Sequence, residues 1–207
     1  MANLYLVGIG PGSGKYLTKE AEDVVNSSEV VFGSRRALQL FTNMKAEKIE
    51  LNAQNMGAML KNAVLKAADG HRVALLSTGD PGFSGLLKPI QKIKGNLSLK
   101  VVPGISSIQL CASKLEIPWD EANIITMHGK GFSSKLLPLL SNGRPTMILP
   151  NTTLHETLNF LIENGTDPER EAAVCENLSY ENERIIKSNL KILLNEKFGY
   201  MCVLVVY

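Results

Sequence analysis

The feature that most constrains the fold is an apolar segment that ends abruptly in glycine and proline, Leu76–Gly85 (LSTGDPGFSG). The residues that lead into it, Val73–Leu76, form a short apolar run typical of a buried parallel strand. Gly79 and Pro81 favour a sharp, fixed turn, because glycine permits positive φ and proline locks φ. Asp80 would then lie at the carboxyl end of the strand, where open α/β sheets bind ligands. The alternative is a plain strand-to-helix turn in which Asp80 caps the next helix.

Short apolar runs alternate with helical patterns through the first half of the chain. The predicted strands are 4–7, 29–32, 73–76 and 97–102, and the predicted helices are 18–25, 37–41, 56–68, 86–93 and 105–115. Strands that alternate with helices across short loops predict a mostly parallel sheet that is covered on both faces. The predicted fold class is therefore α/β.

The pattern changes near Ile117–Asp120 (IPWD). Beyond it, strands are predicted at 124–127, 146–149, 172–175 and 200–206, with helices at 134–140 and 153–164. We therefore expect an N-terminal α/β domain over 1–117 and a C-terminal α/β domain with a mixed sheet over 118–207. The last strand is almost wholly apolar, which predicts a central position in its sheet.

Composition and charge argue against several classes of protein. The 207 residues carry a net charge of +2 with no long Lys/Arg block, which argues against nucleic-acid binding. Apolar runs fall short of the roughly 18 residues that cross a membrane. Cys111, Cys175 and Cys202 have neither disulfide-framework nor metal-ligand spacing. We expect buried thiols, no protein-bound metal, and a cytoplasmic protein.

The first glycine loop, Gly8–Lys15 (GIGPGSGK), matches neither of two common phosphate-binding patterns. The dinucleotide pattern GxGxxG fails at its third glycine, where Ser13 or Lys15 stands. Pro11 also removes an N–H group that a phosphate-binding loop would use. The loop is better suited to a bulky ligand, with a tight turn as the alternative.

A third strand end, Val101–Ser107 (VVPGISS), also runs into glycine and small hydroxyl residues. Ser106 and Ser107 are expected either to cap the next helix or to bind a ligand there. Loops that follow parallel strands emerge at one edge of the sheet, so all three are predicted to converge on a ligand crevice.

Together, GIGPGSGKYLT, STGDPGF and VVPGISS resemble the three signatures of the tetrapyrrole methyltransferases, which are S-adenosylmethionine-dependent enzymes of corrin and sirohaem synthesis. Further segments resemble the branch of that family that methylates C5 of precorrin-6Y or cobalt-precorrin-7; these are Gly33–Arg36, Ile117–Asp120, Met127–Lys130, Val174–Tyr180 and Glu183–Ile185. The resemblance implies two α/β domains of the tetrapyrrole methylase fold (class III methyltransferase), with the methyl donor between them. It also implies S-adenosylmethionine as co-substrate and a corrinoid as substrate.

The resemblance also implies which residues contact the donor. They are Pro11, Thr78, Gly79, Asp80, Phe83, Ser106, Ser107 and Asn151. A further family contact would fall near Ser188, where this chain has Ser-Asn-Leu instead of the family's Gly-Thr-Leu.

The corrinoid carries many carboxylates, which Arg35 and Arg36 are suited to bind because guanidinium groups match carboxylates. A solvated basic pair is the alternative. His128 and Glu176 are the candidates for accepting a proton, and an ordinary structural role stays open for His128. His71 and His155 are expected at the surface or at helix ends.

Several expectations about partners follow from the resemblance. Because the chain ends at Tyr207, we expect C5 methylation only, with a separate C15-methyltransferase and decarboxylase, a cobalt-containing substrate and a homodimer. The alternatives are a diphthamide-pathway methylase of the same fold, a binding module without turnover, and an NAD(P)-dependent oxidoreductase in which Arg35 and Arg36 would receive a 2′-phosphate.

Overall fold

The computed structural model describes residues 3–129, 131, 135–151 and 153–207. The chain divides into two compact units, 1–106 and 107–207. Lys130 and Ser134, which the sequence placed in a family segment and at a helix start, lie outside the described residues. The division falls one helix before the boundary expected at 117, because α5 (Ser107–Leu115) packs on the sheet of the second unit.

The first unit is built on a parallel sheet. Its strands are β1 (Leu4–Gly8), β2 (Val30–Gly33), β3 (Glu47–Glu50), β4 (Val73–Ser77) and β5 (Leu99–Val102), in the order β3-β2-β4-β1-β5. Every neighbouring pair is parallel, and the strand that leads into the STGDPGF turn is the central one. The mostly parallel sheet is therefore confirmed.

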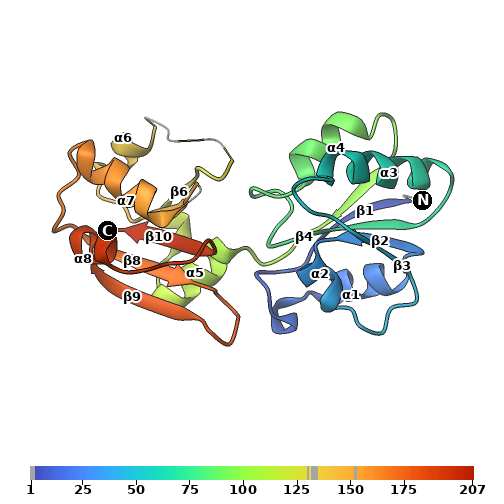
Figure 1. Cartoon of the computed structure of the whole chain (residues 1–207), viewed down its shortest axis with the longest axis horizontal. Coiled ribbons are helices and arrows are strands. Elements are labelled where there is room, and N and C mark those ends of the chain that lie inside the picture. Colours follow the sequence, from blue (N-terminus) through green and yellow to red (C-terminus); the bar gives the residue numbers. More distant parts are fainter. Residues whose placement is uncertain (1–2, 130, 132–134, 152) are drawn as a thin grey trace. The chain divides into compact units, whose positions relative to one another are not determined.

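Helices cover both faces of this sheet. Figure 1 shows α1 (Lys19–Asn26) and α2 (Arg35–Gln39) on one face, and α3 (Met56–Ala68) and α4 (Leu87–Ile93) on the other. Alternate residues of β1 serve the two cores: Tyr5 and Val7 pack with α1 and α2, whereas Leu4 and Leu6 pack with α3 and α4. Burial on both faces explains why the strand is apolar throughout.

The second unit has a mixed sheet, as the sequence predicted. Its strands are β6 (Asn123–Thr126), β7 (Thr146–Leu149), β8 (Glu171–Glu176), β9 (Arg184–Asn189) and β10 (Cys202–Val206), in the order β6-β7-β10-β8-β9. β6 and β7 are parallel, and the other neighbouring pairs are antiparallel. β10 is buried along its whole length in the centre, which confirms its predicted position.

The core of the second unit lies between this sheet and the helices α6 (Leu136–Leu140), α7 (Leu154–Glu163) and α8 (Leu190–Asn195). α5 lies against the sheet through Cys111, whose Sγ is 3.3 Å from Sγ of Cys175 on β8. All three cysteines are free and buried, as predicted. Burial raises the pKa of Cys202 to about 12, so its thiol stays protonated at neutral pH.

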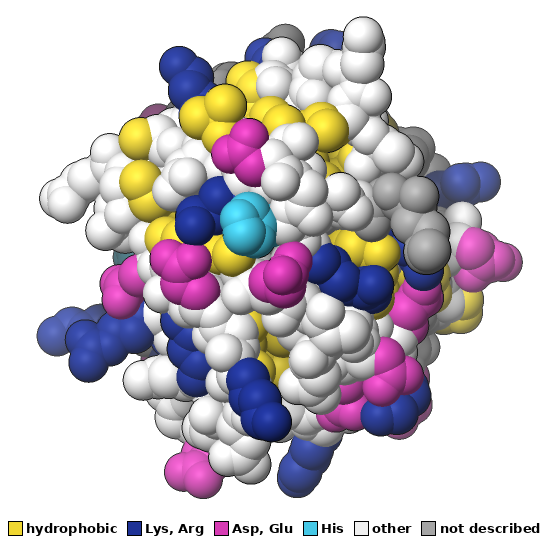
Figure 2. All heavy atoms as spheres, turned by 90° about the vertical axis from the view of Figure 1, so that its right-hand side faces the viewer, with side chains coloured by type: hydrophobic (Ala, Val, Ile, Leu, Met, Phe, Trp, Pro, Cys, Tyr) yellow, Lys and Arg dark blue, Asp and Glu magenta, His cyan; other side chains and the backbone are white. Residues whose placement is uncertain are grey.

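Acidic and basic side chains are interspersed on the face of the molecule that Figure 2 shows. Among the ion pairs of the first unit, Lys66 pairs with Glu47 (Nζ–Oε2 3.0 Å), and His71 lies near Glu29 (Nδ1–Oε2 3.8 Å). Such a mixture accords with the small net charge of +2. Of the helices in the described part of the chain, none has the length and apolar character needed to span a bilayer.

Candidate functional site

The first and second glycine loops pair with each other directly beyond the sheet. The N–H of Ile9 donates to the carbonyl of Ser77 (3.0 Å), and the N–H of Gly79 donates to the carbonyl of Gly10 (2.8 Å). Gly10 and Gly79 thereby form an antiparallel bridge after two strands that are parallel. This geometry requires a positive φ, which is 74° at Gly10 and 69° at Gly79.

The third loop packs on the other two through glycine backbone. A Cβ on Gly104 would lie 2.3 Å from the carbonyl oxygen of Gly79 and 2.7 Å from the carbonyl carbon of Gly8. A Cβ on Gly8 would in turn lie 2.5 Å from the backbone nitrogen of Gly104. The three loops therefore meet as closely as main chains can, and their predicted convergence is confirmed.

The carboxylate of Asp80 links the second loop to the third by hydrogen bonds. Its Oδ1 accepts the N–H of Gly82 (2.8 Å), and its Oδ2 accepts the N–H of Gly104 (3.1 Å). Helix α4 begins only at Leu87 and has no side-chain cap. The interpretation of Asp80 as a helix cap is therefore wrong, because its carboxylate joins two loops instead.

The predicted donor contacts of the first unit lie on this loop cluster. Thr78 is exposed, Phe83 is half-buried, and Pro11 and Ser106 are buried. The Cα of Ser106 would lie 3.6 Å from a Cβ on Gly79. The structure thus brings together Thr78, Gly79 and Ser106 at the carboxyl edge of the sheet, whereas Ser107 begins the second unit.

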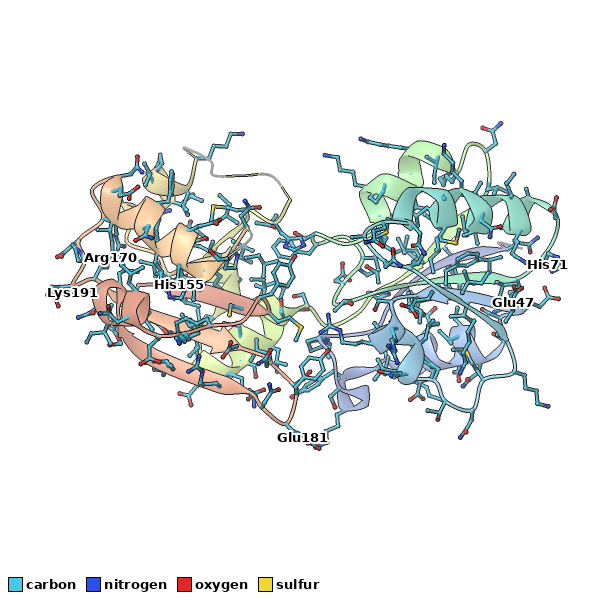
Figure 3. The ribbon with its side chains drawn as sticks, in the orientation of Figure 1. Glu47, His71, His155, Arg170, Glu181 and Lys191 are labelled. Carbon is cyan, nitrogen blue, oxygen red and sulfur yellow. The ribbon has the colours of Figure 1, made fainter. Side chains whose placement is uncertain are left out.

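Arg35 and Arg36 lie at the same edge of the sheet. They form the first turn of α2, directly after β2, which pairs in parallel with β4. Both side chains are exposed. His71 precedes β4 and therefore lies at the opposite edge, away from the loops (Figure 3).

In the second unit, three residues far apart in sequence share one edge of the sheet. His128 follows β6, Asn151 follows β7, and Tyr200 precedes β10, which is antiparallel to β7. The hydroxyl oxygen of Tyr200 lies 3.0 Å from Nδ1 and 2.9 Å from Nε2 of His128. Sequence reasoning placed Tyr200 at the start of the last strand and missed its contact, since an aromatic residue there carries no signal of a histidine 72 positions away.

Glu176 has a different environment from His128. Its side chain is buried, accepts Nε of Arg184 at 2.9 Å, and accepts the N–H of Gly199 through its other oxygen. Ser188 pairs with Ala172 at the amino end of β8, which is the edge opposite to Asn151. Of the second unit's candidates, the structure therefore places His128 and Asn151 together and sets Ser188 apart.

Within the part of the chain that the structure describes, no group of three or more His, Cys, Asp or Glu side chains is arranged to hold a metal ion.

Comparison with known proteins identifies the family. The family model for tetrapyrrole (corrin/porphyrin) methylases matches residues 3–193. A probable cobalt-precorrin-7 C(5)-methyltransferase of Methanocaldococcus jannaschii is 44% identical over 207 residues, which cover 98% of this chain and 96% of that protein. The solved precorrin-6Y methylase of Archaeoglobus fulgidus is 27% identical, with a TM-score of 0.78 and coverage of 98% of this chain and 96% of that one.

A uroporphyrin-III C-methyl transferase of Thermus thermophilus, solved in complex with S-adenyl homocysteine, shares the fold at 21% identity, with a TM-score of 0.77 and coverage of 98% and 91% of the two chains. The family model spans nearly the whole of this chain, including all three glycine loops. The chain therefore belongs to the tetrapyrrole (corrin/porphyrin) methylases and is a methyltransferase.

Proposed function

We propose that this protein transfers a methyl group from S-adenosylmethionine to C5 of the corrin precursor cobalt-precorrin-7, in cobalamin synthesis. The observation that carries the proposal is the 44% identity, over nearly the full length of both chains, to the Methanocaldococcus protein of that name. Precorrin-6Y is the alternative substrate, in line with the name of the Archaeoglobus structure.

The proposed donor contacts are Pro11, Thr78, Gly79, Asp80, Phe83, Ser106, Ser107 and Asn151. The loop cluster fits a bulky donor because it offers an exposed hydroxyl at Thr78 beside a peptide without a side chain at Gly79. The Thermus neighbour, solved with the demethylated donor, supports this use of the fold. When bound, the donor supplies an electrophilic methyl group and leaves as a neutral thioether, so catalysis depends chiefly on positioning.

The other candidate functions have weaker support. Membership of a methylase family favours methyl transfer over NAD(P)-dependent oxidation, in agreement with the missing third glycine of the dinucleotide pattern. The full-length corrinoid relative favours a corrinoid substrate over a diphthamide-pathway one. A separate C15-methyltransferase and decarboxylase, a homodimer and a cytoplasmic location remain part of the proposal.

The decisive experiment is anaerobic incubation with methyl-labelled S-adenosylmethionine and cobalt-precorrin-7. We expect one labelled methyl group at C5, located by NMR, and one equivalent of S-adenosylhomocysteine. A parallel reaction with precorrin-6Y tests the alternative substrate. Donor that binds in equilibrium dialysis but labels neither corrinoid would contradict the proposal, and so would binding of NADPH alone.

We further propose that Arg35 and Arg36 bind carboxylates of the corrinoid. Replacing either by alanine is expected to raise the substrate KM about tenfold, which corresponds to one charge-assisted hydrogen bond of about 1.4 kcal/mol. The donor Kd should stay at its wild-type value, because the exposed arginines follow β2 and the donor loops follow other strands.

The matched control is Arg144→Ala, which removes an exposed arginine from the second unit and should leave both constants unchanged. The substrate KM is measured from initial rates with the donor saturating, and the donor Kd by equilibrium dialysis. A wild-type substrate KM in Arg35→Ala and Arg36→Ala alike would identify the two as a solvated basic pair.

A further inference from the structure

Methylation of a ring carbon leaves a proton to be removed. The substrate carbon forms a bond to the methyl carbon, and the S–CH3 bond breaks with its electron pair retained by sulfur. The same carbon then releases its hydrogen as a proton, and the C–H electron pair returns to the ring. The overall exchange of C–H for C–CH3 is balanced by one proton, which a nearby base can accept.

The second unit holds a histidine that is suited to this task. His128 is exposed at the sheet edge that also carries Asn151, a proposed donor contact. Tyr200, which is 62% exposed, faces it with ring centroids 5.4 Å apart and ring planes inclined at 58°. A neutral imidazole has one N–H group and one free lone pair. In the tautomer whose N–H donates to the Tyr200 oxygen, the second nitrogen carries the lone pair that can take a proton, and that nitrogen also lies about 3 Å from the hydroxyl.

The four residues before Tyr200, Glu196–Gly199, are held in place by contacts with the ion pair of Glu176 and Arg184. Each residue of this segment contacts one of the two side chains: Glu196 by an ion pair (3.6 Å), Lys197 by its carbonyl, Phe198 by its ring (4.8 Å from the guanidinium carbon) and Gly199 by its N–H. Because four consecutive residues are held, the backbone that carries Tyr200 is held as well.

The same contacts argue against Glu176 as the base. Its side chain is 7% exposed, and its two oxygens accept Arg184 and the N–H of Gly199. A buried carboxylate whose two oxygens already accept hydrogen bonds presents little of its surface to a substrate. His128, by contrast, is exposed to solvent.

We propose that His128 accepts the proton released by the methylation and that Tyr200 is its positioning residue. This inference rests on the proposed function, since it requires a carbon that is methylated with loss of hydrogen. Glu176 and Arg184 then contribute indirectly, because they hold the segment 196–199 that leads into Tyr200.

The test compares initial rates of cobalt-precorrin-7 methylation in four proteins: wild type, His128→Ala, Tyr200→Phe and the double variant. We expect His128→Ala to lower kcat about 100-fold, the low end of what general bases contribute. The donor Kd should not change. Imidazole in the buffer should restore part of the rate, because the vacated site faces solvent. His71→Ala, at the far edge of the other sheet, serves as the histidine control and should keep the wild-type rate.

Tyr200→Phe is expected to lower kcat about tenfold and to keep the wild-type melting temperature, since the hydroxyl is at the surface. If Tyr200 acts through His128, the double variant should be no slower than His128→Ala alone. A merely structural tyrosine would make the two losses multiply.

A wild-type kcat in His128→Ala, or a loss that imidazole does not relieve, would contradict the proton-accepting role. Multiplying losses in the double variant would contradict the positioning role of Tyr200. A wild-type protein that methylates no corrinoid would instead contradict the proposed function itself, so the two failures are distinguishable.

Discussion

Gly104→Ala is expected to abolish measurable binding of S-adenosylmethionine and to lower the free energy of unfolding by about 3 kcal/mol. The added Cβ would lie 2.3 Å from the carbonyl oxygen of Gly79 and 2.7 Å from the carbonyl carbon of Gly8. Both neighbours are main-chain atoms at the ends of adjacent strands, so neither can move aside as a side chain would. The third loop must shift away, which opens the cluster that the proposed donor site is built on.

Donor Kd by equilibrium dialysis and the urea dependence of unfolding measure the two effects separately. Gly57→Ala in α3 is the control, because a Cβ there meets no atom within 4 Å. Alanine at that helical position should raise the free energy of unfolding by up to about 1 kcal/mol. A Gly104→Ala protein that binds the donor with the wild-type Kd would show that the close approach of the three loops is dispensable for the site.

The sequence predicted the central elements of the fold well because burial leaves a strong compositional signal. β4 and β10, which lie in the middle of their sheets, are apolar along almost their whole length. The two strands that were missed, β3 (EKIE) and β9 (RIIKSN), are edge strands with mostly exposed or half-buried residues. An edge strand buries little, so polar residues are tolerated and the pattern disappears.

The sequence predicted which loops form the candidate site, but it did not predict the contacts between their residues. Glycines after parallel strands indicated that three loops would converge, and they do. The bond from Gly104 to Asp80 joins residues 24 positions apart, and that from Tyr200 to His128 joins residues 72 apart. Neither pair has a local sequence pattern, because only the order of the strands brings them together.

The boundary between the two units also depends on a long-range contact that has no local sequence pattern. The change of pattern near Ile117–Asp120 marks the end of α5, whereas the compact units separate before that helix. What assigns α5 to the second unit is its packing on the sheet there, where Cys111 meets Cys175. A helix that follows the strands of one sheet and precedes those of another in the sequence carries an apolar face whichever sheet it packs on. Its periodicity therefore could not decide to which sheet it belongs.

Asp80→Ala is expected to raise the donor Kd about 100-fold and to lower the free energy of unfolding by about 2 kcal/mol. Two charge-assisted hydrogen bonds, to the N–H groups of Gly82 and Gly104, are lost together. Each is worth about 1.5 kcal/mol or more to the folded loops. Loops that are no longer joined must be ordered again when the donor binds, and every ~1.4 kcal/mol of that cost raises the Kd tenfold. Because Asp80 is half-buried, water can replace part of what the two N–H groups lose, which keeps the cost to the fold moderate.

Asp80→Asn separates the two bonds, because the amide retains one acceptor oxygen and turns an NH2 group toward the other N–H. We therefore expect its donor Kd to lie between those of wild type and Asp80→Ala. Asp69→Ala, which removes an exposed aspartate after α3 in the same unit, should leave the Kd unchanged. A lower melting temperature with a wild-type donor Kd in Asp80→Ala would mean that the carboxylate stabilises the fold only. Donor binding would then not depend on how the second and third loops are joined.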